Sequence, residues 1–247
     1  ARASLLPHTT YSPCGGWFVP LKTSRTSRAR VRRPVSLSDF RLGRPLGTYS
    51  KVQALVTRGL RNRRFQLRSP RVTRKQYLNV GCGPNTHPAF VNVEHQWHPG
   101  IDLCWDITTG LPLRDGSMRG IFTEHCLEHF SLPQARALLR EHHRVLQPGG
   151  TLRVGVPDAG LYLQLYIRHM AGDTKDAFPY MDEERADGLT SPLASVNRSF
   201  YVDRDSAAGH RNMYDEALLT EVLIQAGFHG ARRESFRSGR DPALLID

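Results

Sequence analysis

Two glycines and one acid are the residues of this sequence best suited to holding a small ligand. Gly81 and Gly83 directly follow the apolar segment YLNV, and Glu94 ends the next apolar segment, FVNVE. A glycine turn after a buried strand lets a ligand approach the backbone, and an acid at the end of the following strand can accept hydrogen bonds from ribose hydroxyls. We therefore expect a ligand that contains a nucleoside.

The same spacing disfavours a dinucleotide such as NAD. Thr86 stands where the dinucleotide fingerprint has its third glycine, and only 13 residues separate Gly81 from Glu94. Dinucleotide folds place about 20 residues there, enough for a full helix. The shorter connection favours a smaller nucleoside ligand without a pyrophosphate.

A second pattern, HCLEH at residues 125–129, matches the H-x-x-E-H signature of zinc peptidases. That chemistry requires both histidines on one helix and a third ligand from elsewhere in the chain. Here His125 ends an apolar segment that we expect to be a strand. We therefore expect structural roles for Glu128 and His129, and no metal site.

The elements that must position these residues alternate between strands and helices. Apolar segments typical of buried strands lie at 77–80, 90–94, 119–125 and 151–158, and amphipathic helices are expected at 131–146 and 214–228, with an edge strand at 230–237. Such alternation favours a parallel sheet covered by helices. The predicted fold is α/β: a Rossmann-like, mostly parallel sheet with helices on both faces.

The charge is distributed very unevenly along the chain. Residues 1–76 hold 18 of the 34 Lys and Arg but a single acid, Asp39, while residues 77–247 hold the other 22 acids. We divide the chain into a basic Arg/Ser-rich extension, 1–76, and a domain, 77–247, in which 173–209 is a lid or insertion. Within the extension, helical spacing of Val52, Leu55, Val56 and Leu60 predicts one short amphipathic helix from about residue 48 to 66.

Three interpretations of the extension remain open. An acid-poor start rich in Arg and Ser is typical of organellar targeting segments. Arginines such as those between 28 and 33 could also bind the phosphates of RNA, and a solvated tail without a partner is the third possibility. We expect an organellar protein (plastid or mitochondrion), soluble or peripheral to a complex, whose extension docks on an acidic partner, either a protein complex or RNA. No run of 18 apolar residues predicts a transmembrane segment.

Several ordered motifs together resemble the class I S-adenosylmethionine-dependent methyltransferases, in particular the type 11-like group with a shortened first crossover. The resemblance extends from residue 77 to about residue 230. It is carried by the segments YLNVGCGPN, FVNVE, DLCWDITTGLPLRDGSMRGIFTEHCLEHF, REHHRVLQPGGTLRVGVPD and HRNMYDEALLTEVLIQAGF.

The resemblance implies roles for individual residues and S-adenosylmethionine as the cofactor. Glu94 would hold the ribose hydroxyls, and Glu124 with His125 would face the sulfonium and the substrate pocket. The methionine part of the cofactor would be bordered by Asn79, Gly81, Cys82 and Gly83, and the adenine amino group by Asp106 and Ile107. Asn79 replaces the acid that many such enzymes have in the first strand.

Methyl transfer from a sulfonium is an in-line displacement, for which positioning is the main contribution of the protein. If the acceptor must lose a proton, His125 is the first candidate base and Tyr214 the second. In the resembling family a stretch like 210–215 lies near the substrate opening, but Asp215 could instead cap a helix and Tyr214 could pack in the core.

Two functions from different classes remain. The first is an active methyltransferase whose acceptor the sequence does not name. The second is a catalytically silent, methyltransferase-like subunit of a large organellar assembly, anchored by its basic extension. An acceptor amino group on a nucleic-acid base is disfavoured, because the third strand ends in Thr-Glu-His-Cys and not in the Asn/Asp-Pro-Pro-Tyr/Phe tetrapeptide.

Overall fold

The structure is a computed structural model, and most of the chain is described in it. The described residues are 2–5, 47–176, 178–179, 181–186, 188–201, 209–235 and 238–246. The arginines between 28 and 33 lie outside these ranges, as do residues 202–208 of the expected lid or insertion.

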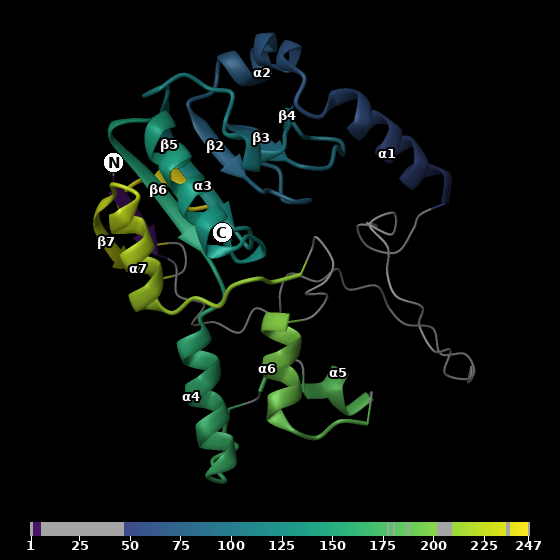
Figure 1. The fold of residues 1–247 in the computed structure, drawn as a ribbon, viewed down its shortest axis with the longest axis vertical. Helices are drawn as coiled ribbons and strands as arrows, with labels where there is room; N and C mark the ends of the chain where they lie inside the picture. Colours follow the sequence, from purple (N-terminus) through teal and green to yellow (C-terminus); the bar gives the residue numbers. More distant parts are fainter. Residues whose placement is uncertain are drawn as a thin grey trace.

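Seven strands in the described part of the chain form one sheet, and every neighbouring pair is parallel (Figure 1). Their order is β4-β3-β2-β5-β6-β1-β7. The strands are β1 (Arg2–Leu5), β2 (Tyr77–Val80), β3 (Phe90–Glu94), β4 (Leu103–Cys104), β5 (Met118–Glu124), β6 (Leu146–Gly155) and β7 (His229–Arg233). The α/β fold expected from the sequence is confirmed, and β7 lies at the sheet edge as expected.

The strand order reverses next to β2. From β2 the chain moves outward through β3 to β4, then crosses back to β5 on the other side of β2 and continues to β6. Because parallel strands all point the same way, β2, β3 and β5 end at one edge of the sheet. Ligands of doubly wound sheets bind at this edge, where the strand order reverses.

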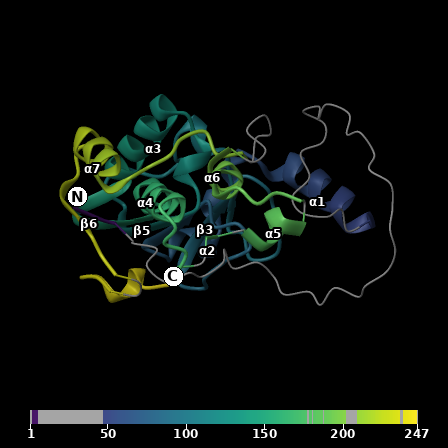
Figure 2. The same ribbon diagram turned by 90° about the horizontal axis from the view of Figure 1, so that it is seen from below.

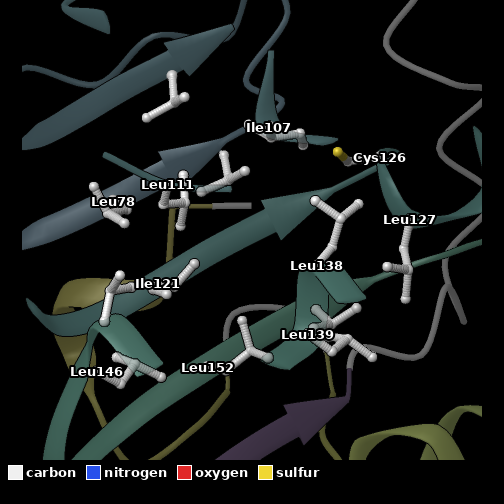
Figure 3. Packing of buried hydrophobic residues seen from close by; sticks show 14 of the residues in the cluster. Leu78, Ile107, Leu111, Ile121, Cys126, Leu127, Leu138, Leu139, Leu146 and Leu152 are labelled. Carbon is white, nitrogen blue, oxygen red and sulfur yellow. The ribbon is translucent and has the colours of Figure 1, made fainter. Parts of the chain in front are cut away.

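One face of the sheet carries the main core, under α3 (Leu132–Val145) and α7 (Glu216–Gln225). Strand residues two apart, such as Leu78 and Val80, are fully buried on this face because side chains alternate along a strand. Leu138 and Leu139 of α3 pack onto it (Figure 3). Ser131 is the N-cap of α3 and forms a capping box with Gln134.

The opposite face is covered mainly by the C-terminal segment. Phe90 and Phe122 point to this side and pack with Leu244 of the short 3-10 helix η5 (Pro242–Leu244). The fully buried Arg153 also faces this side, and its guanidinium donates to the carbonyl of Ser238 at 2.6 Å. Among the described residues, this face is thus covered by η5 and the segment around it, while α3 and α7 cover the other face.

A second helical layer lies beyond the carboxyl ends of the strands (Figures 1 and 2). It consists of α4 (Ala159–Met170), α5 (Met181–Ala186) and α6 (Pro192–Tyr201), which share a core of their own around Leu165, Phe178 and Phe200. The expected lid or insertion at 173–209 contributes α5 and α6 to this layer. None of the helices among the described residues is both long enough and apolar enough to cross a membrane.

The basic extension contains α1 (Gly47–Leu60), the 3-10 helix η2 (Arg64–Arg68) and α2 (Pro70–Thr73). The predicted helix thus ends near residue 60, and its apolar Val52 and Leu55 are 50% and 72% exposed. Beyond residue 56 the extension packs on the domain: Val72 joins the main core, and Lys75 forms an ion pair with Asp102 at 2.7 Å. Contacts therefore cross the compositional boundary at residue 76, and β1 places the first residues inside the sheet.

Candidate functional site

The turn after β2 is built around two glycines with left-handed backbone. Gly81 and Gly83 have φ of +66° and +49°, which favours glycine. A Cβ on Gly81 would lie 2.8 Å from the Cβ of Cys126, whereas a Cβ on Gly83 would meet no atom within 4 Å. Gly81 is thus pressed against the segment that follows β5, and Gly83 faces open space where a ligand could approach the backbone.

Glu94 lies directly across this turn. Its Oε2 accepts a hydrogen bond from the backbone N–H of Gly83 at 3.0 Å, and its Oε1 accepts from the N–H groups of His95 and Gln96. Each carboxylate oxygen can accept two hydrogen bonds, so Oε1 is fully used and Oε2 can accept one more, from a hydroxyl donor. The structure therefore brings together Gly81, Gly83 and Glu94, as the sequence predicted.

Asn79 is buried under the turn and is not open to a ligand. Only 3% of its surface is exposed, and its Nδ2 donates to the carbonyl of Asn85 at 2.8 Å. Asn92, on the neighbouring strand, accepts from the N–H of His87 and thereby holds the other end of the loop. Cys82 is also buried, and burial raises the pKa of its thiol. These residues order the loop from within.

Asp106 and Ile107, the residues expected to border the adenine, follow β4. The Oδ1 of Asp106 accepts from the backbone N–H and the hydroxyl of Thr108, which caps the 3-10 helix η3 (Ile107–Thr109). Ile107 is buried in the main core. Part of the hydrogen-bonding capacity of Asp106 is thus used for capping.

Glu124 and His125 end β5 at the same edge of the sheet. Glu124 is half-buried, and His125 has a 40% exposed side chain and a φ of +49°, a conformation that costs energy for a residue with a Cβ. The Nδ1 of His125 lies 3.2 Å from Oε1 of Glu128. Burial alone would lower the pKa of His125, but the hydrogen bond and charge of Glu128 outweigh it and raise that pKa above its ordinary value.

Glu128 lies at the centre of a cluster of histidines. It is 1% exposed and belongs to the 3-10 helix η4 (Leu127–His129). Its Oε1 lies 3.2 Å from Nδ1 of His125 and 4.0 Å from Nε2 of His210, and His129 belongs to the same cluster. Burial opposes ionisation of Glu128, but the hydrogen bond from His125 and the nearby histidines hold its pKa below the ordinary value.

Tyr214 and Asp215 have the structural roles that the sequence left open. Asp215 caps α7, because its Oδ1 accepts from the N–H of Leu218 at 2.8 Å. Tyr214 is completely buried in the main core, and burial raises its pKa to about 12. A buried hydroxyl with that pKa is a poor general base, so the geometry argues against Tyr214 in this role and leaves His125 as the candidate.

Two residues of the extension reach the site and were not predicted from the sequence. Asn62 accepts a hydrogen bond from the N–H of Asp106 at 2.8 Å. Gln66 pairs with β4: its Oε1 accepts from the N–H of Cys104 at 2.9 Å. Both lie among arginines beyond Leu60, the last residue of the apolar spacing that predicted the helix, so that pattern did not identify them.

The segment from the glycine turn to β6 matches a known family. Residues 81–154 match the family model described as "Methyltransferase domain". This part of the chain is a methyltransferase domain by its sequence. A search of the curated proteins found no match.

The matched segment of the methyltransferase domain contains most of the site. It begins at Gly81, includes Glu94 and His125, and ends inside β6. Tyr214 and His210 lie outside it, as does the whole basic extension. The matched segment thus includes the turn after β2 and the end of β5, the two places that flank the reversal of strand order.

Proposed function

We propose that this protein transfers a methyl group from S-adenosylmethionine to an acceptor bound beside His125. The observation that carries the proposal is the open Gly83 backbone facing the Glu94 carboxylate, at the edge where the strand order reverses. Family membership supports the reaction, because methyltransferases of this type generally use this cofactor.

The residues present fit this cofactor. A left-handed turn without a side chain at Gly83 leaves room for the amino-acid part, and the Glu94 carboxylate is the acceptor that ribose hydroxyls require. Asp106 and Ile107 would border the adenine from the far side of β3. When bound, the cofactor supplies a methyl group on a positively charged sulfur.

The chain itself contributes alignment and a proton acceptor. Holding two reactants in line contributes about 7–11 kcal/mol to lowering a barrier. The His125 side chain is 40% exposed just after β5 and its Nδ1 pairs with Glu128, so His125 is the candidate that would take a proton from the acceptor. The raised pKa of His125 makes it a stronger base than an ordinary histidine.

Calorimetric titration with S-adenosylmethionine tests the proposal. We expect micromolar binding that weakens at least tenfold in Glu94→Ala and is unchanged in Glu221→Ala, a matched loss of an exposed glutamate on α7. A folded wild-type protein that does not bind S-adenosylmethionine would contradict the proposal and favour a silent subunit.

We also propose that the basic extension recruits the domain to an acidic partner within an organelle. Five arginines between residues 63 and 74 are all exposed, with no acid among them, and Phe65 between them is 60% exposed. Such a surface attracts polyanions, and salt weakens the attraction.

Replacing Arg63, Arg64, Arg68 and Arg71 by glutamine tests recruitment separately from catalysis. Co-sedimentation with large assemblies of an organellar extract should fall in the variant and in high salt, while S-adenosylmethionine binding stays unchanged. Equal co-sedimentation of both proteins at all ionic strengths would count against recruitment through this surface.

A further inference from the structure

The cluster around Glu128 brings together three potential metal ligands from two distant parts of the chain. The three residues are Glu128, His129 and His210. Each offers one ligand atom, and these atoms all lie within 4.8 Å of one another. Glu128 and His129 follow β5, whereas His210 precedes α7. The two segments are joined by the backbone, because the N–H groups of Arg211 and Asn212 both donate to the carbonyl of Glu128, at 2.7 and 3.2 Å.

Each of the three side chains has a buried polar atom that lacks a hydrogen-bond partner among the described residues. These atoms are Oε2 of Glu128, Nδ1 of His129 and Nδ1 of His210. Buried polar groups are otherwise nearly always paired, because leaving one unpaired costs free energy. A carboxylate that is 1% exposed and has an unpaired oxygen beside two such imidazoles is a strong exception.

Hydrogen bonds within the protein satisfy only part of this cluster: the His210 ring bonds to the backbone of Ser199, but its Nδ1 has no partner among the described residues. His210 lies 4.0 Å from Oε1 of Glu128, too far for a hydrogen bond. The rings of His129 and His210 pack edge to face with centroids 4.9 Å apart, an arrangement that leaves their nitrogens unpaired with each other. The Glu128 carboxylate pairs with His125 through Oε1 and accepts a hydrogen bond from its own backbone, whereas Oε2 has no partner among the described residues.

Two imidazoles and one carboxylate are a common ligand set for zinc, with a fourth position left to water. Ligand atoms around a tetrahedral zinc lie about 3.3 Å apart, given bonds of about 2.0–2.1 Å, so small side-chain rotations would close the site. Metal-bound carboxylates are also held by a hydrogen bond from a second residue, and His125 provides one to Glu128.

We propose that Glu128, His129 and His210 form a binding site for a divalent transition metal ion, with Zn²⁺ as the favoured occupant. The sequence analysis expected no metal because His125 ends a strand and so does not share a helix with His129, whereas the folded chain adds His210 to Glu128 and His129. The arrangement differs from that of a zinc peptidase: His125 ends a strand, and Glu128 is itself a ligand. A bound ion would fasten the segment before α7 to the turn that carries His125.

Zinc titration of the tag-free full chain, stripped with a chelator, tests the site without reference to the methyltransferase activity. We expect one Zn²⁺ per chain with micromolar or tighter affinity. Binding should weaken at least tenfold in His210→Ala and in Glu128→Gln and stay unchanged in His229→Ala, which removes an exposed histidine of β7. Absence of stoichiometric binding, or full binding by His210→Ala, would overturn the proposal.

X-ray absorption at the zinc edge of the loaded wild-type protein provides a second test that needs no variant. The spectrum should show two imidazoles and oxygen ligands. A sulfur ligand would place the ion elsewhere, for example at the buried Cys126, and would equally overturn the proposal. S-adenosylmethionine binding is measured separately, so failure of this site leaves the proposed function standing.

Discussion

The backbone of Gly81 packs directly against the side chain of Cys126. A Cβ on Gly81 would lie 2.8 Å from the Cβ of Cys126. The contact joins the turn after β2 to the segment after β5, the two strands between which the sheet order reverses. The turn after β2 is thereby fixed against the segment that carries His125. Any side chain at Gly81 would push these two parts of the site apart.

Gly81→Ala should therefore destabilise the fold more than Gly83→Ala does. Both substitutions impose a positive φ on alanine, which costs about 1–2 kcal/mol, but only Gly81→Ala adds a clash with Cys126. We expect a difference of at least about 1 kcal/mol in the free energy of unfolding, measured by urea denaturation. Equal stability of the two variants would mean that the Gly81–Cys126 contact relaxes without cost.

At position 125, glycine should give a more stable protein than alanine. The positive φ of His125 suits glycine, so His125→Gly should exceed His125→Ala by about 1 kcal/mol in the free energy of unfolding. The matched pair at His143, inside α3, should show the opposite order, since glycine is the weaker helix former. The same order at both positions would argue against backbone strain at His125.

His142 should make stability depend on pH. It is 2% exposed, both ring nitrogens lack partners among the described residues, and burial lowers its pKa to about 4. Because the unfolded histidine titrates near 6.5, the unfolded state binds a proton between pH 6.5 and 4 that the folded state does not. Folding stability should therefore fall by about 3 kcal/mol as the pH falls through this window.

His142→Leu should flatten this dependence and leave stability at pH 7 unchanged or higher, because no unpaired nitrogen is then buried. Urea denaturation of both proteins at a series of pH values measures it. The exposed His229→Leu serves as control and should keep the wild-type profile. A wild-type profile in His142→Leu would show that other groups cause the pH dependence.

Gln66→Ala should destabilise the domain although Gln66 belongs to the basic extension. The substitution leaves the buried N–H of Cys104 without its acceptor, which costs about 1–3 kcal/mol. Thermal denaturation should show a lower midpoint than for Gln76→Ala, which removes an exposed glutamine nearby. Identical midpoints would mean that the extension does not support β4.

Several features of the protein follow from local sequence alone. Apolar segments of strand length alternate with amphipathic helices, and this pattern is sufficient to predict a parallel α/β sheet. The Gly81 turn and the Glu94 acid come at strand ends, so chain order alone places them at the same edge. Asp215 is recognisable as a helix cap because capping depends on residues three positions away.

Other features depend on contacts that only the folded chain brings about. His210 meets Glu128 because the segment before α7 is hydrogen-bonded to the turn after β5, and no spacing in the sequence predicts this contact. Gln66 reaches β4, and Arg2–Leu5 enters the sheet beside β6, from a segment that composition marks as an extension. The burial of Tyr214 and the positive φ of His125 likewise depend on the packing around them. Sequence determines local propensity, whereas long-range packing decides which polar groups contact one another and which are buried.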